Sequence, residues 1–204
     1  MLNESAFTLI NWQTGNPAFR IFSFEDSSFF DQLQRNNFFT LIWVMNRAGK
    51  VNVDFNEFDF EENTLFAFAP YQPFIFSPDK PINGIAIYFH FDFFCIYKHQ
   101  KELELNGILY NNIYQSPFVK VDEDSAVTFK TLFGQIKTEM QTPALAQHEL
   151  LVAYLKIFLI TATRLKMQPQ PQAAEMTINS KEPFILQKLK DAIEENYKVK
   201  HATA

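Results

Sequence analysis

Between residues 19 and 93, short apolar runs alternate with polar or proline-bearing segments, a pattern typical of β-strands separated by turns. Residues 38–45 are rich in β-branched and aromatic side chains, which favour strands. Residues 47–50 contain a glycine, and residues 51–55 then alternate with a period of two. We therefore expect these two runs to form a β-hairpin.

Three more short runs of this kind follow at residues 58–60, 64–69 and 74–76. In the next run, 82–91, odd-numbered positions from 85 onward carry large apolar residues and even-numbered positions from 84 onward carry small or partly polar ones, as expected for the two faces of one strand. One face carries Ile85, Ile87 and Phe89, and the other carries Gly84, Ala86, Tyr88 and His90. At least six short strands without a helical pattern between them predict an antiparallel barrel or sandwich.

After Tyr114 the apolar period becomes that of helices. Asp122 can cap a first helix whose apolar side chains recur on one face. These side chains are Phe129, Leu132, Phe133, Ile136 and Met140. Thr142 and Pro143 are typical of an N-cap and a first helical position, so we expect a second helix from there to about Met167. The short connection predicts two antiparallel neighbours.

The second helix is apolar nearly all round between Leu150 and Ile160, so more than one of its sides must be covered. The barrel can cover one side and a second copy of the chain the other, which predicts an isologous homodimer. The residues predicted for this interface are Leu151, Tyr154, Leu155, Phe158 and Leu159.

The chain should divide into a barrel at 1–118, a helical dimerisation hairpin at 119–167, a polar and proline-bearing linker at 168–182, and an amphipathic helix within 183–204. A single helix beyond a linker cannot bury its own apolar stripe. We therefore expect this last helix to be the start of another domain.

Phenylalanine accounts for 24 of the 204 residues, against only 5 glycines. The sequence contains neither of the glycine-rich motifs GxGxxG and GxxxxGK(S/T), which argues against a nucleotide-phosphate site of the usual kind. Most of the rings should be core, and a minority could line a cavity in the barrel, where the small Gly84 and Ala86 leave room for a ligand or for neighbouring rings. The candidate ligand-binding residues are Arg20, Trp43, Phe55, Phe66, Phe68, Phe76, Ala86 and Tyr88.

The formal charge of −5 argues against a surface that binds DNA as a whole. The single Cys95 excludes an internal disulfide and fits a reducing compartment. Residues 1–10 lack the basic region of a signal peptide, and the apolar run 150–160 is too short to span a membrane and contains Lys156. We expect a soluble, cytoplasmic protein without a membrane partner.

Candidate catalytic groups are few. A cupin-type metal site needs two histidines as HxH plus further ligands, and this chain offers only the pairs His90 with Asp92 and His99 with Glu102. Cys95 lies in an apolar run where a thiol is usually inert, and no GxSxG motif occurs. The sequence therefore predicts no catalytic residue, no metal and no cofactor.

Arg20 lies inside an apolar strand at residues 18–24. If its side chain points inward, it would pair with a carboxylate or phosphate of a ligand. The alternative is an arginine at the edge of a strand, in contact with water.

Several runs resemble AraC-family transcription regulators, in particular those common in Bacteroidetes. The resemblance lies at residues 41–44, 53–55, 70–74, 88–95, 106–112 and 154–159. It implies a cupin-like effector-binding barrel, a helix pair that makes the dimer, and a C-terminal domain whose helix-turn-helix units bind DNA. Residues 186–197 resemble the first helix of that domain, and its recognition helices are absent from this sequence.

The resulting fold class is α+β, mainly β: a cupin-like jelly-roll barrel, an antiparallel helix pair and a tethered C-terminal helix. The favoured function is ligand sensing and dimerisation in an AraC-type regulator that is not an enzyme. Its partners would be a second copy, a small apolar or aromatic effector, and DNA through the missing domain only. A metal-dependent cupin enzyme and a dimerisation module without a ligand are the alternatives.

Overall fold

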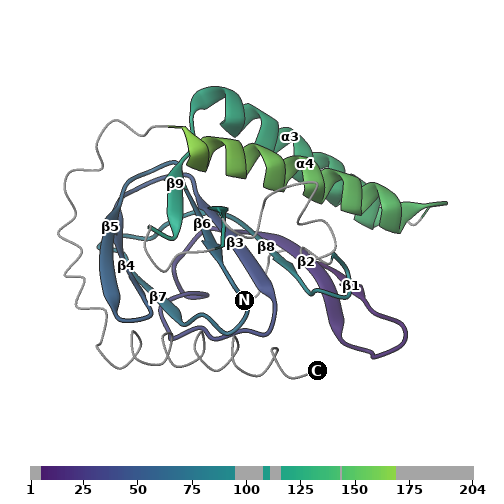
Figure 1. Ribbon diagram of the computed structural model, residues 1–204, viewed down its shortest axis with the longest axis horizontal. Helices are drawn as coiled ribbons and strands as arrows, with labels where there is room; N and C mark the ends of the chain where they lie inside the picture. The colour runs from purple at the N-terminus through teal and green to yellow at the C-terminus, as the bar shows by residue number, and fades with distance from the viewer. Residues whose placement is uncertain (1–5, 95–107, 111–115, 143, 169–204) are drawn as a thin grey trace, which may run out of the picture. The chain divides into compact units, whose positions relative to one another are not determined.

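The computed structural model describes residues 6–94, 108–110, 116–142 and 144–168, and it confirms an α+β, mainly β architecture (Figure 1). The predicted linker, apart from Gln168, and the predicted C-terminal helix lie outside the described residues. The strands are β1 (Phe7–Ile10), β2 (Pro17–Phe24), β3 (Phe39–Val44), β4 (Gly49–Val53), β5 (Asn56–Phe60), β6 (Thr64–Phe68), β7 (Phe74–Ser77), β8 (Gly84–Phe89) and β9 (Phe118–Lys120). The helices are α3 (Glu123–Gln141) and α4 (Gln147–Met167).

The strands form two antiparallel sheets with the order of a jelly roll. The larger sheet runs β1-β2-β8-β3-β6-β9 and the smaller β5-β4-β7. An isolated antiparallel bridge joins Gln34 to Phe74 on β7, so the segment between β2 and β3 adds a rudimentary fourth strand to the smaller sheet. From β2 to β8 the chain therefore passes between the sheets in the pattern of two Greek keys. This topology confirms the predicted jelly-roll barrel.

The predicted hairpin of residues 38–55 is wrong, because β3 and β4 belong to different sheets. The hairpin that forms is β4–β5, where Val53 pairs with Asn56 across a two-residue turn. Asp54 in this turn has a φ of 55°, as tight hairpin turns require. Lys50 on β4 pairs across the two strands with Glu57 and Asp59 on β5.

The larger sheet is buried on both faces. All six residues of β3 and all five of β6 are buried. On β8, Ala86 and Tyr88 face the space between the sheets, whereas Ile85, Ile87 and Phe89 face the helices, as the alternation predicted. The core therefore has two layers, separated by this sheet.

The first helix begins as predicted. The Oδ1 of Asp122 accepts a hydrogen bond from the backbone N–H of Ser125 at 2.8 Å. The predicted start of the second helix is wrong: Thr142 is the C-cap of α3, and α4 begins at Gln147 after Ala146, whose φ is 61°. The Gln147 side chain donates to the Glu139 carbonyl at 2.7 Å, which ties this connection to α3.

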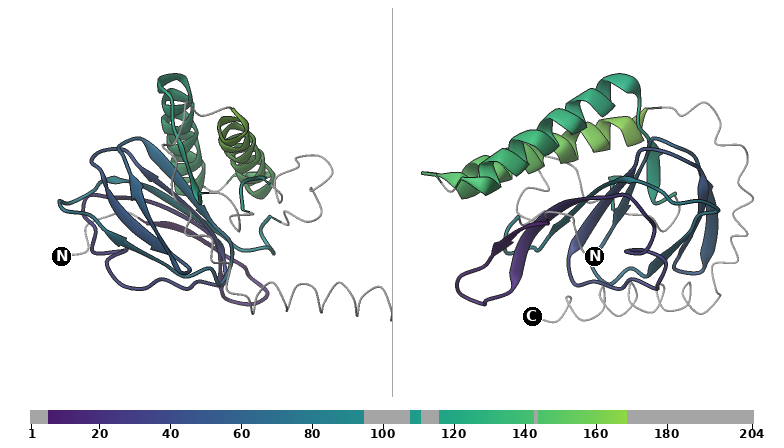
Figure 2. Two further views of the ribbon diagram at one scale, coloured as in Figure 1. Left: turned by 60° about the vertical axis from the view of Figure 1, so that its left-hand side comes forward. Right: turned by 180° about the vertical axis from the view of Figure 1, so that it is seen from behind.

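The two helices lie side by side over the outer face of the larger sheet (Figure 2). Phe129 of α3 stacks on Phe158 of α4 with ring centroids 4.1 Å apart, and Trp43 of β3 meets Phe129 edge to face at 5.7 Å. Neither of the described helices is long and apolar enough to cross a membrane.

Gly84 is required for the close approach of β8 to β3. A Cβ built on it would lie 1.9 Å from the Trp43 carbonyl oxygen and 2.8 Å from the Phe24 ring. A Cβ on Gly134 in α3 would meet no atom within 4 Å. We predict that Gly84→Ala lowers the free energy of unfolding by about 1–3 kcal/mol or more, because the added methyl overpacks the sheet.

In the same urea-unfolding measurement, Gly134→Ala should raise the free energy of unfolding by about 0.5–1 kcal/mol, because alanine favours the helix. Equal stability of the two variants would contradict the described packing around Gly84.

Candidate functional site

The space between the sheets is filled largely by aromatic rings. Phe68 stacks on Phe74 at 4.0 Å, and Phe66 meets Phe76 edge to face at 4.9 Å. These four side chains are each less than 2% exposed. Three of them, Phe66, Phe68 and Phe76, were predicted as ligand contacts, and in the structure they contact one another or further rings. The space expected beside Gly84 is likewise taken by the ring of Phe24.

Two predicted ligand-binding residues lie outside the barrel interior. Trp43 points to the helix layer, because its position on β3 has the opposite parity to the inward-facing Ile42 and Val44. Phe55 is 90% exposed, because the strand ends at Val53 and Phe55 occupies the hairpin turn. Neither can line an interior cavity in this structure.

Of the remaining candidates, Ala86 is fully buried in the core between the sheets, and Arg20 and Tyr88 point to one end of the barrel, which we call the barrel mouth. Arg20 on β2 pairs in register with Tyr88 on β8, and both have the parity of inward-facing neighbours, Phe22 and Ala86. A cavity of about 70 Å³ lies here. Its lining residues are Pro17, Ala18, Phe19, Arg20, Phe38, Tyr88, Phe89 and His90.

Arg20 is a charged group with few partners. Its guanidinium carbon lies 4.8 Å from the centroid of the Phe22 ring, a cation–π contact. Its Nε atom is buried and has no hydrogen-bond partner, and the described residues offer it no ion pair. Arg20 is partly exposed, so the structure fits neither a fully buried arginine nor one that lies wholly in water.

Tyr88 supplies an aromatic wall beside Arg20. Its ring stacks on Phe38 at 4.7 Å and meets Phe22 edge to face at 5.4 Å. Burial raises the pKa of the Tyr88 hydroxyl well above its usual value, and the nearby Arg20 charge opposes this only in part. The hydroxyl is therefore neutral at ordinary pH and can donate a hydrogen bond.

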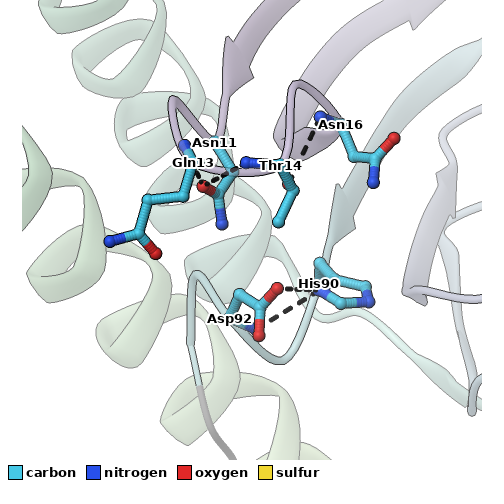
Figure 3. Close-up of polar contacts among 6 residues, drawn as sticks. All are labelled: Asn11, Gln13, Thr14, Asn16, His90 and Asp92. Carbon is cyan, nitrogen blue, oxygen red and sulfur yellow. Dashed lines mark hydrogen bonds and ion pairs between the residues drawn. The ribbon is translucent and has the colours of Figure 1, made fainter.

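A second, more polar cavity of about 210 Å³ adjoins the first and shares Pro17, Ala18, Phe38 and His90 with it. Figure 3 shows its polar groups on the β1–β2 turn and at the end of β8. In the turn, Asn11 Oδ1 accepts from the backbone N–H groups of Gln13 and Thr14. His90 Nδ1 lies 3.1 Å from Asp92 Oδ2 across the cavity wall.

These polar residues do not make a metal centre. In the described parts of the chain, no group of three or more His, Cys, Asp or Glu side chains converges. The pair of His90 and Asp92 is short of the three or four protein ligands that zinc or a similar metal requires. Cys95, His99 and Glu102 lie outside the described residues.

The predicted dimer interface needs correction. Four of its five residues, Leu151, Leu155, Phe158 and Leu159, are at most 2% exposed in a single chain, because α3 and the larger sheet cover them. Tyr154 alone keeps partial exposure. The outer face of α4 instead presents Leu150, Ala153, Tyr154, Ile157 and Thr161 at helical spacing, which we call the outer stripe.

The barrel mouth is connected to α4 by a chain of rings. Phe19, which lines the 70 Å³ cavity, lies 4.7 Å from Phe93. Phe93 in turn meets the imidazole of His148, in the first turn of α4, at 5.0 Å. The residues of β2 at the mouth are therefore linked by two ring contacts to the first turn of α4.

Phe38, Asn37 and the residues of the β1–β2 turn were not predicted as site residues. Phe38 directly precedes β3 and lies two and four residues before the inward-facing Thr40 and Ile42. The period of two along a strand could therefore have identified Phe38 from the sequence. The β1–β2 turn approaches His90 only through the strand order of the folded sheet, so no local signal marks it.

No protein-family model matches the chain, and no curated protein matches it in sequence. Solved structures with partial similarity include a cupin protein from Bacteroides fragilis, with 12% identity, 36% of this chain and 66% of that chain covered, and a TM-score of 0.32. A cupin superfamily protein from Desulfitobacterium hafniense has 12% identity, 44% and 79% coverage, and a TM-score of 0.33. A salicylate 1,2-dioxygenase from Pseudaminobacter salicylatoxidans has 13% identity, 42% and 26% coverage, and a TM-score of 0.31.

Likeness at these values carries no activity over to this chain. The jelly-roll, cupin-like fold is given by the strand order itself.

The interior rings and the exposed Phe55 give a matched pair of variants. We predict that Phe66→Ala lowers the free energy of unfolding by about 3–5 kcal/mol, because it leaves a cavity in a close-packed core. Phe55→Ala should change it by less than about 0.5 kcal/mol. Denaturant unfolding measures both, and a small loss for Phe66→Ala would mean that the interior is loosely packed and open to ligands.

Proposed function

We propose that this chain is the ligand-sensing and dimerisation part of an AraC-type transcription regulator, and that it is not an enzyme. The runs that resemble this family and the succession of a jelly-roll barrel and a helix pair support the proposal. In this proposal the protein is cytoplasmic, and DNA is bound through a C-terminal domain whose first helix lies within residues 183–204.

One observation carries the proposal: the contact chain Phe19–Phe93–His148 joins the barrel mouth to the first turn of α4. A ligand in the mouth that prefers one position of β2 would bias the position of α4. Coupling of this kind requires that the ligand bind the two arrangements with different affinity.

The dimer in this proposal forms through the outer stripe of α4. Leu150 is 39% and Ile157 46% exposed, and both lie on one face of the helix. If two copies of α4 pack antiparallel with Ile157 near the two-fold axis, Glu149 of each copy lies opposite Arg164 of the other. This charge complementarity favours a second copy as the occupant of the stripe.

The filled interior of the barrel favours a second candidate, a dimerisation module without a small-molecule ligand. The two candidates differ only at the mouth, so a ligand titration separates them. The cupin enzyme alternative has less support, because the described residues do not assemble a set of metal ligands.

Replacement of Ile157 by glutamate tests the dimer. We predict that the chain sediments as a dimer at micromolar concentration and that Ile157→Glu raises the dimer dissociation constant at least about tenfold, because it buries unpaired charges at the interface. Val127→Glu is the matched control, because Val127 is an exposed apolar residue of α3 outside the stripe. A monomeric parent chain, or equal effects of the two variants, would contradict the proposed interface.

The regulatory role can be tested in cells. The chain is fused to a DNA-binding domain that occupies its operator only as a dimer, and reporter repression is measured. Repression that Ile157→Glu relieves and Val127→Glu preserves supports a dimerising regulator. No repression by the parent fusion would count against it.

A further inference from the structure

We propose that the barrel mouth binds a small organic monocarboxylate with a planar apolar body, with the carboxylate on Arg20 and the body against Phe38 and Tyr88. This inference gives the effector of the proposed sensor a chemical class. Only the regulatory role of the ligand rests on the proposed function.

The charge of Arg20 is the first argument. Partial burial of an arginine without an ion-pair partner costs free energy, because its charge loses part of its contact with water, and a carboxylate can offset this cost. Arg20 faces the barrel interior and is partly exposed. Its Nε is buried without a hydrogen-bond partner, and its guanidinium lies over the ring of Phe22. A ligand carboxylate can satisfy two guanidinium N–H groups at once, in the planar geometry that arginine favours.

The number of charges favours a monoanion over a phosphate. Among the described residues that line the two cavities at the mouth, Arg20 is the only Lys or Arg. Asp92 lines the outer cavity, so a second negative charge on the ligand would face its carboxylate. A dianionic phosphate would therefore have one cation and one opposing anion.

The shape of the mouth determines the rest of the ligand. Phe38 and Tyr88 stack on each other with ring centroids 4.7 Å apart, so a ligand cannot lie between them, but both border the cavity that Arg20 lines. The outer surface of this stacked pair favours a planar apolar group. The cavity that Arg20 and Tyr88 line has a volume of about 70 Å³, and the adjoining outer cavity has about 210 Å³. Both volumes lie below the roughly 300–1,000 Å³ of sites for drug-sized ligands, so the ligand must be small. The neutral Tyr88 hydroxyl can donate a further hydrogen bond.

Benzoate and benzamide are suitable probes, because they have nearly the same size and shape and differ in charge. We expect calorimetric or ligand-observed NMR titration of the whole chain to show that benzoate binds at least about tenfold more tightly than benzamide. Inorganic phosphate should bind more weakly than benzoate. Equal affinity for benzoate and benzamide, no binding of benzoate, or tighter binding of phosphate would overturn the proposal.

Substitution of Arg20 assigns the binding to the mouth. Arg20→Met should weaken benzoate binding by about 10- to 100-fold, whereas Arg35→Met, at an exposed arginine outside both cavities, should leave it unchanged. Because Arg20 is a charge without an acidic partner, its loss should leave the unfolding midpoint in urea unchanged or higher. A purely structural role for Arg20 would instead lower the midpoint and leave benzoate affinity unchanged, which would overturn the proposal.

A conservative variant covers the case in which Arg20→Met does not fold. Arg20→Lys keeps the charge but not the planar fork, and it should weaken benzoate binding by about tenfold; full affinity would overturn the bidentate contact. The dimer measurements are independent of this test. Benzoate binding by a chain that remains monomeric would refute the proposed dimer and support the ligand site. A dimer that does not bind benzoate would support the dimer and refute the ligand site.

Discussion

Burial of the larger sheet on both faces is the constraint on which the rest of the structure depends. The central strands β3, β6 and β8 must place apolar side chains at successive positions, because one parity faces the smaller sheet and the other faces α3 and α4. The smaller sheet and the helix pair therefore pack against opposite faces of the larger sheet, in two separate core clusters. Each is positioned by the side of the sheet that it covers.

The same constraint places the barrel mouth and the helices on opposite faces of the same strands. On β2, Arg20 faces the mouth, and the adjacent Phe19 and Ile21 belong to the helix-side core. A close-packed sheet transmits a displacement instead of absorbing it, since it has few voids into which side chains can relax. The ring contacts from Phe19 through Phe93 to His148 are one such closely packed connection.

Much of the architecture follows from local patterns: the strand series, the two faces of β8 and the Asp122 cap were all predictable. What failed depended on long-range pairing. Residues 38–55 look like a hairpin, but in a jelly roll these neighbouring strands enter different sheets. The orientation of Trp43 was hidden because every residue of β3 is buried, and α4 is too apolar for its outer face to be recognised. The sequence identifies Arg20 as a candidate, but only the folded structure shows that its Nε has no hydrogen-bond partner.

The β5 strand matters for the solubility of so phenylalanine-rich a chain. In the described residues β5 is the outer strand of the smaller sheet, where unpaired backbone groups invite pairing with another chain. Its exposed positions carry Glu57 and Asp59, whose side chains are 52% and 80% exposed. Two copies approaching edge to edge would bring these carboxylates together. The charged edge thus opposes the polymerisation to which a chain with 24 phenylalanines would otherwise be prone.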